Sequence, residues 1–178
     1  TEYQLNRLRE YGELVLNPSF KELTTIRIGG QAKALFYPQS ILSLQAMVRF
    51  CKQEKLPYFG IGSGSNLLVS DEHYPGIIIK LNRTINEVYL INETRFEVHA
   101  GTSLIALCHK VRKLGFSGLE WAAGIPGCVG GATFMNAGAY NKSMSDLITE
   151  VCVLKDDEII WLKAEACDFN YRDSIFKK

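Results

Sequence analysis

Residues 118–140 read Gly-Leu-Glu-Trp-Ala-Ala-Gly-Ile-Pro-Gly-Cys-Val-Gly-Gly-Ala-Thr-Phe-Met-Asn-Ala-Gly-Ala-Tyr and hold six of the chain's 15 glycines. Glycine in such numbers weakens any helix or strand, so these glycines are expected where the backbone needs positive φ or approaches another group closely. A buried turn and a cradle for a large ligand both fit this stretch. The rest of the chain must decide between them.

A second glycine-rich loop follows residues 58–61, an apolar run that predicts a buried strand. The loop consists of Gly62, Ser63, Gly64, Ser65 and Asn66. Its successive N–H groups suit a pyrophosphate, because each N–H aimed at an oxygen stabilises negative charge. The loop lacks the Gly-Lys-Ser/Thr ending of a P-loop and does not open a helix as Gly-x-Gly-x-x-Gly. A plain tight turn therefore stays open as the alternative.

Together the two glycine-rich segments suggest a long ligand, such as a dinucleotide, lying between two subdomains, where crevices commonly form. Four apolar side chains near the second segment suit a flat aromatic ring, although core packing explains each of them as well. They are Trp121, Ile125, Val129 and Phe134.

The composition is that of an ordinary soluble globular protein, with 47% apolar residues, 22% charged residues and a formal net charge of +1. This balance gives no electrostatic case for a nucleic acid or a membrane surface as partner. Five cysteines without a Cys-x-x-Cys pair predict buried thiols in a reducing cytoplasm, and the three histidines lack ligand spacing, so no metal is predicted. No apolar run approaches the ~20 residues of a membrane span, and no signal peptide is recognisable. We expect a soluble cytoplasmic protein, whose oligomeric state the sequence does not indicate.

The spacing of apolar residues predicts a βαβ-like first part with a parallel or mixed sheet. Its expected elements are a short amphipathic helix over residues 3–16, a strand over 34–38, a helix capped by Ser40 and running to about Lys55, and strands over 58–61 and 77–80. The pattern changes near Asn82 without a linker.

Antiparallel hairpins are expected in the second part, over residues 88–100 and 151–163, with a helix capped by Ser103 between them. The division predicts one subdomain over residues 1–81 and a second over 82–178.

Near the end of the chain, Tyr171-Arg172-Asp173-Ser174 places a guanidinium and two hydroxyls beside a carboxylate. An arginine can hold an anionic substrate group bidentately, and a hydroxyl can donate a proton where its environment permits. A surface ion pair between Arg172 and Asp173 is the simpler alternative.

Four motifs in this order resemble the UDP-N-acetylenolpyruvoylglucosamine reductase (MurB) family of bacterial peptidoglycan synthesis. They lie at residues 25–30, 62–71, 118–140 and 171–177, and together they extend over nearly the whole chain. The Gly-Leu-Glu-Trp-Ala-Ala-Gly form is similar to the shorter, type II branch of the family.

The resemblance implies an α+β, FAD-binding fold of the vanillyl-alcohol-oxidase (PCMH) type, in which a small α/β subdomain and a larger α+β subdomain clasp FAD. It also implies an oxidoreductase in which NADPH reduces FAD. The hydride then passes to UDP-N-acetylglucosamine enolpyruvate and gives UDP-N-acetylmuramate. The flavin carries the hydride, and the protein positions and polarises the substrate.

Individual residues receive roles from the same resemblance. Residues 62–66 would wrap the pyrophosphate, and Arg172 would stabilise the enolate that develops at the substrate carboxylate, supported by Tyr171 and Ser174 as substrate contacts. The flavin would be bordered by Ile125, Gly127, Gly130, Gly131 and Ala132.

One departure separates this chain from the family pattern. A third domain of about a hundred residues, a size typical of a small domain, follows the Tyr-Arg-x-Ser motif in the family and supplies a proton-donating serine, a glutamate and most contacts to the UDP-sugar. Ser174 is not that serine. We therefore expect this chain to bind FAD and to turn over substrate poorly or not at all.

Two other hypotheses stay open. The first is a non-catalytic module of the same fold that binds FAD or another nucleotide. The second, an oxidase of the vanillyl-alcohol type, is disfavoured because no histidine or cysteine stands in a motif for covalent attachment of a flavin.

Overall fold

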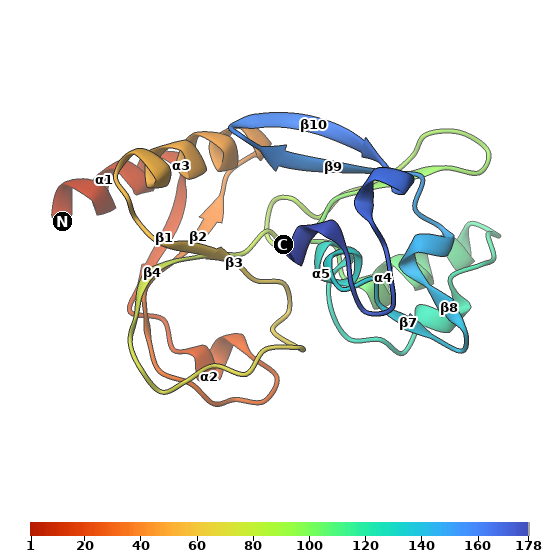
Figure 1. Cartoon of the computed structure of the whole chain (residues 1–178), viewed down its shortest axis with the longest axis horizontal. Helices are drawn as coiled ribbons and strands as arrows, with labels where there is room; N and C mark the ends of the chain where they lie inside the picture. Colours follow the sequence, from red (N-terminus) through yellow and green to blue (C-terminus); the bar gives the residue numbers. More distant parts are fainter. Residues whose placement is uncertain (178) are drawn as a thin grey trace. The chain divides into compact units, whose positions relative to one another are not determined.

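A computed structural model describes residues 1–177, which fall into two compact units (Figure 1). The first unit is Thr1–Asn86, and the second is Glu87–Lys178, of which the description extends to residue 177. Each unit has its own cluster of buried apolar side chains. No helix formed by residues 1–177 is long and apolar enough to cross a membrane.

The first unit is built on a four-stranded mixed sheet with the strand order β1-β2-β4-β3. Strand β1 runs antiparallel to β2, whereas β2 and β3 both run parallel to β4. The elements are α1 (Glu2–Tyr11), β1 (Gly12–Leu16), α2 (Phe20–Leu23), β2 (Ala32–Pro38), α3 (Ile41–Gln53), β3 (Tyr58–Gly60) and β4 (Tyr74–Ile79) (Figure 1).

The helix predicted over residues 3–16 is only partly correct, because α1 ends at Tyr11 and Gly12 begins strand β1. A Cβ atom at Gly12 would lie 2.1 Å from the carbonyl oxygen of Tyr37, so glycine lets the chain turn directly onto β2. The strand then pairs with β2 over all five of its residues. Pairing with a distant strand overrides the helical spacing of the leucines.

Strand β2 and helix α3 form the centre of the first unit. Phe36 in β2 and Met47 in α3 are fully buried. The predicted cap of α3 is confirmed, since the Ser40 hydroxyl accepts a hydrogen bond from the Ser43 N–H. On the same helix, burial raises the pKa of the Cys51 thiol to about 12.

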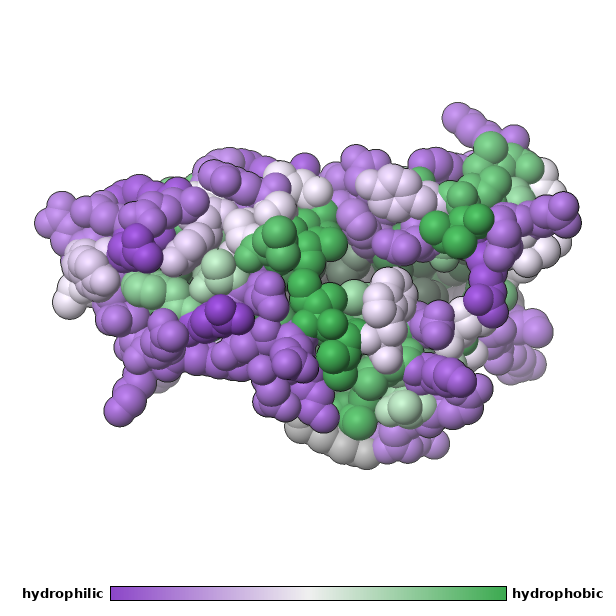
Figure 2. Space-filling view, turned by 90° about the horizontal axis from the view of Figure 1, so that it is seen from above, coloured by the Kyte–Doolittle hydropathy of each residue, from purple (hydrophilic) through white to green (hydrophobic). Residues whose placement is uncertain are grey.

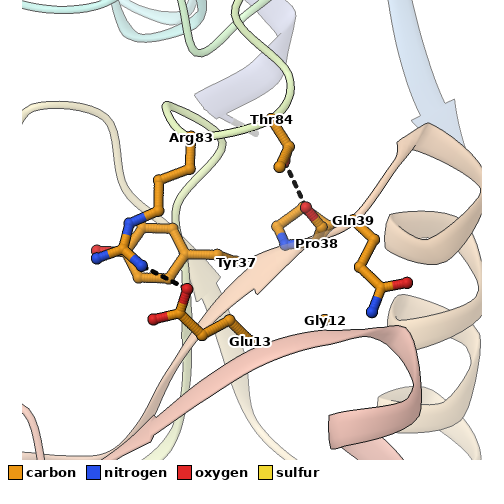
Figure 3. Close-up of a pocket in the computed structure, with 7 residues that line it drawn as sticks. All are labelled: Gly12, Glu13, Tyr37, Pro38, Gln39, Arg83 and Thr84. Atoms are coloured by element: carbon orange, nitrogen blue, oxygen red, sulfur yellow. Dashed lines mark hydrogen bonds and ion pairs between the residues drawn. The ribbon is translucent and has the colours of Figure 1, made fainter.

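Residues after β4 stay attached to the first unit. The guanidinium of Arg83 lies 3.9 Å from the centre of the Tyr37 ring and forms an ion pair with Glu13 (Figure 3). The Thr84 hydroxyl donates a hydrogen bond to the Pro38 carbonyl, beside a pocket of about 350 Å³. These contacts explain why the first unit extends to Asn86, beyond the boundary after residue 81 that the sequence suggested.

The second unit combines short helices with three two-stranded antiparallel sheets. Both predicted hairpins are present, as is the helix capped by Ser103, whose hydroxyl accepts from the Ala106 N–H. The elements are β5 (Val88–Leu90), β6 (Phe96–Val98), α4 (Leu104–Lys113), η1 (Glu120–Ala122), α5 (Val129–Phe134), β7 (Gly138–Ala139), β8 (Lys142–Ser143), η2 (Met144–Asp146), β9 (Glu150–Lys155), β10 (Glu158–Lys163), η3 (Ala164–Cys167) and η4 (Ile175–Lys177).

Helix α4 provides the core of the second unit. Its residues Leu104 and Leu107 are buried, and the rings of Phe96 and Phe116 meet edge to face beside them, 4.9 Å apart. Apolar side chains also reach the surface of the chain (Figure 2). On β10, Trp161 is 55% exposed.

The central strand β4 supports a test of the first unit's core. Ile78 is 1% exposed, so Ile78→Ala should destabilise the protein by about 2–5 kcal/mol through lost burial and a cavity. Ile41→Ala, at a side chain that is 41% exposed, is the matched control and should cost less than about 1 kcal/mol. Urea denaturation measures both, and equal losses would contradict this description of the core.

Candidate functional site

The loop of residues 62–66 is held by backbone contacts just before it and at its centre. Before it, the Ile61 N–H donates to the Ile79 carbonyl at 2.9 Å, which fixes the chain beside the end of β4. Within it, Gly64 has a φ of +69°, and a Cβ there would lie 2.1 Å from the Leu23 carbonyl oxygen. The Thr25 N–H donates to the Gly64 carbonyl at 3.1 Å. Only glycine fits this position, and the loop is therefore shaped by its packing on residues 23–25.

A second loop, residues 24–30, lies against the chain that follows residues 62–66. The Gly30 N–H donates to the Ser70 carbonyl at 2.9 Å, and a Cβ at Gly30 would lie 2.4 Å from the Asp71 carbonyl oxygen. The buried Thr24 hydroxyl donates to the Phe20 carbonyl at 2.9 Å. Two motifs that are separate in the sequence are thus joined side by side in the first unit.

In the second unit, the glycine-rich stretch runs beside residues 100–104. The Val129 N–H donates to the Thr102 carbonyl and the Gly130 N–H to the Ala100 carbonyl, both at 2.8 Å. A Cβ at Gly130 would lie 2.8 Å from the Cβ of Ala100. The close approach of the two segments therefore requires glycine at residue 130.

Helix α5 lies inside this stretch, for which no helix was predicted. Cys128 caps it, since its sulfur accepts from the Gly131 N–H at 3.4 Å. A Cβ at Gly131 would meet only that sulfur, at 3.5 Å, and Gly131 is exposed. The packing of the described residues therefore does not require glycine at 131.

The residues expected to border the flavin lie close together in the chain and in space. Gly127, Gly130, Gly131 and Ala132 form the entry and first turn of α5, and the half-buried Ile125 lies two residues before Gly127. Their role toward a flavin stays a prediction.

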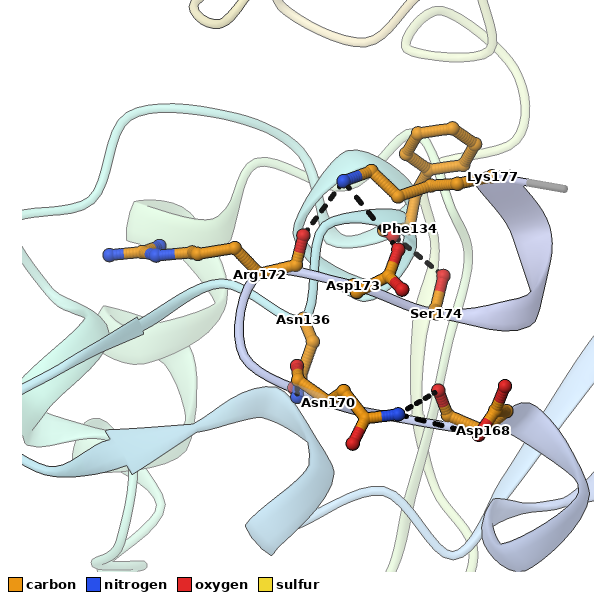
Figure 4. Close-up of polar contacts among 8 residues, drawn as sticks. All are labelled: Phe134, Asn136, Asp168, Asn170, Arg172, Asp173, Ser174 and Lys177. Carbon is orange, nitrogen blue, oxygen red and sulfur yellow. Dashed lines mark hydrogen bonds and ion pairs between the residues drawn. The ribbon is translucent and has the colours of Figure 1, made fainter.

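Two buried side chains attach the C-terminal segment to this stretch (Figure 4). The Ser174 hydroxyl is fully buried and donates to the Phe134 carbonyl at 2.7 Å. Asn136, 6% exposed, donates from Nδ2 to the Asn170 carbonyl at 2.9 Å and accepts from the Ser145 N–H at 3.0 Å. A buried amide must satisfy its hydrogen bonds, so Asn136 fixes three segments at once.

Arg172 is presented to solvent by the segment that these contacts hold. Its backbone has a φ of +54°, and its Nη2 donates to the Gly138 carbonyl at 2.8 Å. The side chain points away from Asp173, which pairs instead with Lys177 at 3.7 Å (Figure 4). No other hydrogen bond within residues 1–177 engages the Arg172 guanidinium, so its remaining N–H groups are available for an anion.

The three residues predicted at the substrate differ in exposure. Tyr171 is 92% exposed next to Arg172, whereas Ser174 is fully buried and its proton is used within the protein. Asn136 was not singled out from the sequence. The available signal was a polar residue inside an otherwise apolar, glycine-rich stretch.

Cysteines and histidines contribute no metal site within residues 1–177, where no group of three or more potential ligands occurs. All five cysteines are free.

Comparison with known families defines the class of protein. Residues 32–163 match the family model described as FAD binding domain, so the chain belongs to the FAD binding domain family. A crystal structure of UDP-N-acetylenolpyruvylglucosamine reductase from Thermus caldophilus is similar, with a TM-score of 0.72, 34% identity, and coverage of 92% of this chain and 56% of that chain. An alkyldihydroxyacetonephosphate synthase shares the fold with a TM-score of 0.69 at 16% identity.

Similar curated proteins include UDP-N-acetylenolpyruvoylglucosamine reductases. The Bacillus subtilis (strain 168) protein is 40% identical over 171 residues, which are 96% of this chain and 56% of that protein. The Acaryochloris marina protein is 40% identical over 161 residues, 90% of this chain and 52% of that protein. The chain spans about half the length of these relatives. The expected family resemblance, the fold type and FAD as cofactor are confirmed.

The residues present fit FAD. In the first unit, the loop of residues 62–66 has no room for a side chain at Gly64 and places Ser63 at the edge of a cavity. In the second unit, Gly131 leaves bare backbone exposed, and the Cys128 sulfur, 3.5 Å from a Cβ built there, is the only described side chain beside it. These features suit a diphosphate and a flat ring, respectively.

Substitutions at the neighbouring Gly130 and Gly131 distinguish a glycine required for packing from one required for cofactor binding. Gly131→Val should leave the unfolding free energy within about 1 kcal/mol of the original, because a Cβ meets ordinary contact there and glycine is a poor helix former. FAD affinity should nevertheless fall at least about tenfold, because the side chain occupies the space expected for the flavin.

Gly130→Val is the matched control and should destabilise the fold itself, because its Cβ would clash with Ala100. Thermal unfolding and flavin titration measure the two effects. Equal loss of fold and flavin in Gly131→Val would assign residue 131 to packing alone.

Proposed function

We propose that this chain forms the FAD-binding part of a reductase that converts UDP-N-acetylglucosamine enolpyruvate to UDP-N-acetylmuramate, with NADPH as hydride donor, in cytoplasmic peptidoglycan precursor synthesis. The observation that carries the proposal is the 40% identity to a named reductase over 96% of the chain. The substrates are then small molecules. The further contacts that the reaction needs come from the part of the relatives that this chain does not span.

In this proposal each unit contributes one group of residues to the cofactor. Residues 62–66 donate N–H groups to the diphosphate, and residues 125–132 lie along the flavin. When bound, FAD supplies hydride chemistry between NADPH and the enolpyruvyl group, which becomes a lactyl ether. The protein's residues position the reactants and stabilise charge.

Arg172 has the clearest proposed chemical role. Its guanidinium is oriented by the Gly138 carbonyl and keeps further N–H groups for the carboxylate of the enolpyruvyl group. As the hydride adds, negative charge develops toward that carboxylate, and a fixed cation stabilises this charge more than the charge of the ground state. Tyr171 is exposed beside it and suits a substrate contact, whereas Ser174 supports Arg172 through its bond to Phe134.

The 178-residue polypeptide itself provides the first test. We expect it to bind FAD and become yellow, with the absorption bands of a flavoprotein, and to oxidise NADPH with the enolpyruvyl sugar slowly or not at all. Spectroscopic titration and an NADPH absorbance assay measure these outcomes. Colourless protein that FAD cannot titrate would contradict FAD binding. Robust turnover would contradict the proposal that the reaction needs contacts from the part of the relatives that this chain does not span.

Arg172→Ala tests the catalytic assignment in a polypeptide that extends this sequence to the length of its relatives. The turnover number should fall about 10²–10³-fold, as is typical when one charge-stabilising donor is lost. The dissociation constant for FAD should change less than about twofold, because Arg172 is not assigned to the cofactor.

Arg95→Ala, at another exposed arginine of the second unit, is the control and should leave both quantities unchanged. Unchanged turnover in Arg172→Ala would favour the alternative of a non-catalytic FAD-binding module.

A further inference from the structure

A pocket of about 570 Å³ opens in the first unit beside the loop of residues 62–66. Ser63 of that loop lines it, together with residues from the segment after Ser19 and with the residue that directly follows β4. The lining consists of Lys21, Glu22, Leu23, Thr24, Thr25, Arg27, Ser63 and Lys80. Because Ser63 faces this pocket, a group bound by the loop is within reach of the same cavity.

The pocket is electropositive. Three of its lining residues are cationic and one is a carboxylate, which leaves an excess of two positive charges. The Ser63 hydroxyl adds a neutral donor to the lining, whereas the Thr25 hydroxyl donates to the Gly64 carbonyl at 3.4 Å. Such a set of donors suits a phosphate group, because charge-assisted hydrogen bonds to phosphate oxygens are strong and specific.

Arg27 is the residue in this pocket whose conformation calls for an explanation. Its φ is +59°, in the left-handed region, and its N–H donates to the Thr24 carbonyl at 3.3 Å. Such backbone costs about 1–2 kcal/mol for a residue with a side chain. Within residues 1–177 no hydrogen bond or ion pair engages its guanidinium. The fold thus holds an unpaired cation at a strained position, which is typical of binding sites.

We propose that Arg27 binds the diphosphate of FAD from the pocket side, while the Gly62–Asn66 loop binds it with N–H groups. This inference rests on the proposed FAD-binding role of that loop and adds a residue to it. Arginine also suits this role better than lysine, because its planar guanidinium can bind two phosphate oxygens at once.

Lys55 offers a matched control for the substitution. It is an exposed cation in the same unit, also has a left-handed backbone, with a φ of +53°, and does not line the pocket. Asparagine occupies the left-handed region more readily than most residues. Arg27→Asn and Lys55→Asn therefore each remove one positive charge without demanding a new backbone conformation.

The 178-residue chain is titrated with FAD and with riboflavin, which lacks the diphosphate, at two salt concentrations. Arg27→Asn should weaken FAD binding about tenfold or more and reduce its salt dependence, because one charge-assisted contact is lost. In Arg27→Asn, riboflavin affinity should stay within twofold of the original, and the thermal midpoint of the protein without ligand should stay within about two degrees. FAD affinity in Lys55→Asn should also stay within twofold of the original. Arg27→Lys should restore part of the affinity.

Several outcomes overturn the inference. One is FAD binding by Arg27→Asn within twofold of the original. The others are an equal loss of riboflavin affinity in Arg27→Asn and an equal loss of FAD affinity in Lys55→Asn. Where riboflavin binds too weakly to measure, the salt dependence of FAD binding decides between Arg27 and Lys55. If the unsubstituted chain binds no FAD, the proposed function fails together with this inference, whereas normal binding by Arg27→Asn overturns the inference alone.

Discussion

The second unit depends on one close crossing of its backbone, where residues 127–130 run against residues 100–104. Ser103 and Cys128 form an isolated antiparallel bridge at this crossing, and they are also the capping residues of α4 and α5. The two helices therefore start from a single fixed point. At the end of α5, the Phe134 carbonyl accepts a hydrogen bond from Ser174, and Asn136 donates one to the Asn170 carbonyl. These two bonds hold the chain on either side of Arg172, so the position of Arg172 depends on the crossing. A side chain at Gly130 would separate the two segments at their point of closest approach.

The first unit also has glycines where two backbone segments come into close contact. Gly30 lies against the Asp71 backbone, and Gly64 lies against the backbone of Leu23. Backbone hydrogen bonds from Gly30 to Ser70 and from Thr25 to Gly64 fasten the loops together. In both units, then, the glycines that matter for the fold are those that touch another backbone. Gly131, whose added Cβ would make only ordinary contact, stands apart from them.

Local patterns predicted the elements whose stability is local. The caps at Ser40 and Ser103 and both long hairpins are correct, because each depends on residues within a few positions. Strand β1 was missed because its pairing partner, β2, is not adjacent in the chain. Helix α5 was missed because its glycines argue against a helix, and its support comes from contacts with Ala100 and Thr102.

The candidate site likewise has features that local sequence patterns predicted and features that they did not. Glycine loops and the Tyr-Arg-Asp-Ser motif were recognisable, but FAD came from a family resemblance and not from spacing. The sequence could not show that Asp173 forms an ion pair with Lys177 and not with Arg172, or that Asn136 donates to a carbonyl 34 residues away.

The hydrogen bond from the Thr25 N–H to the Gly64 carbonyl also affects ligand binding. Because it orders the loop of residues 62–66 during folding, the conformational entropy of that loop is lost before any ligand arrives, and a ligand's binding energy is not reduced by ordering it.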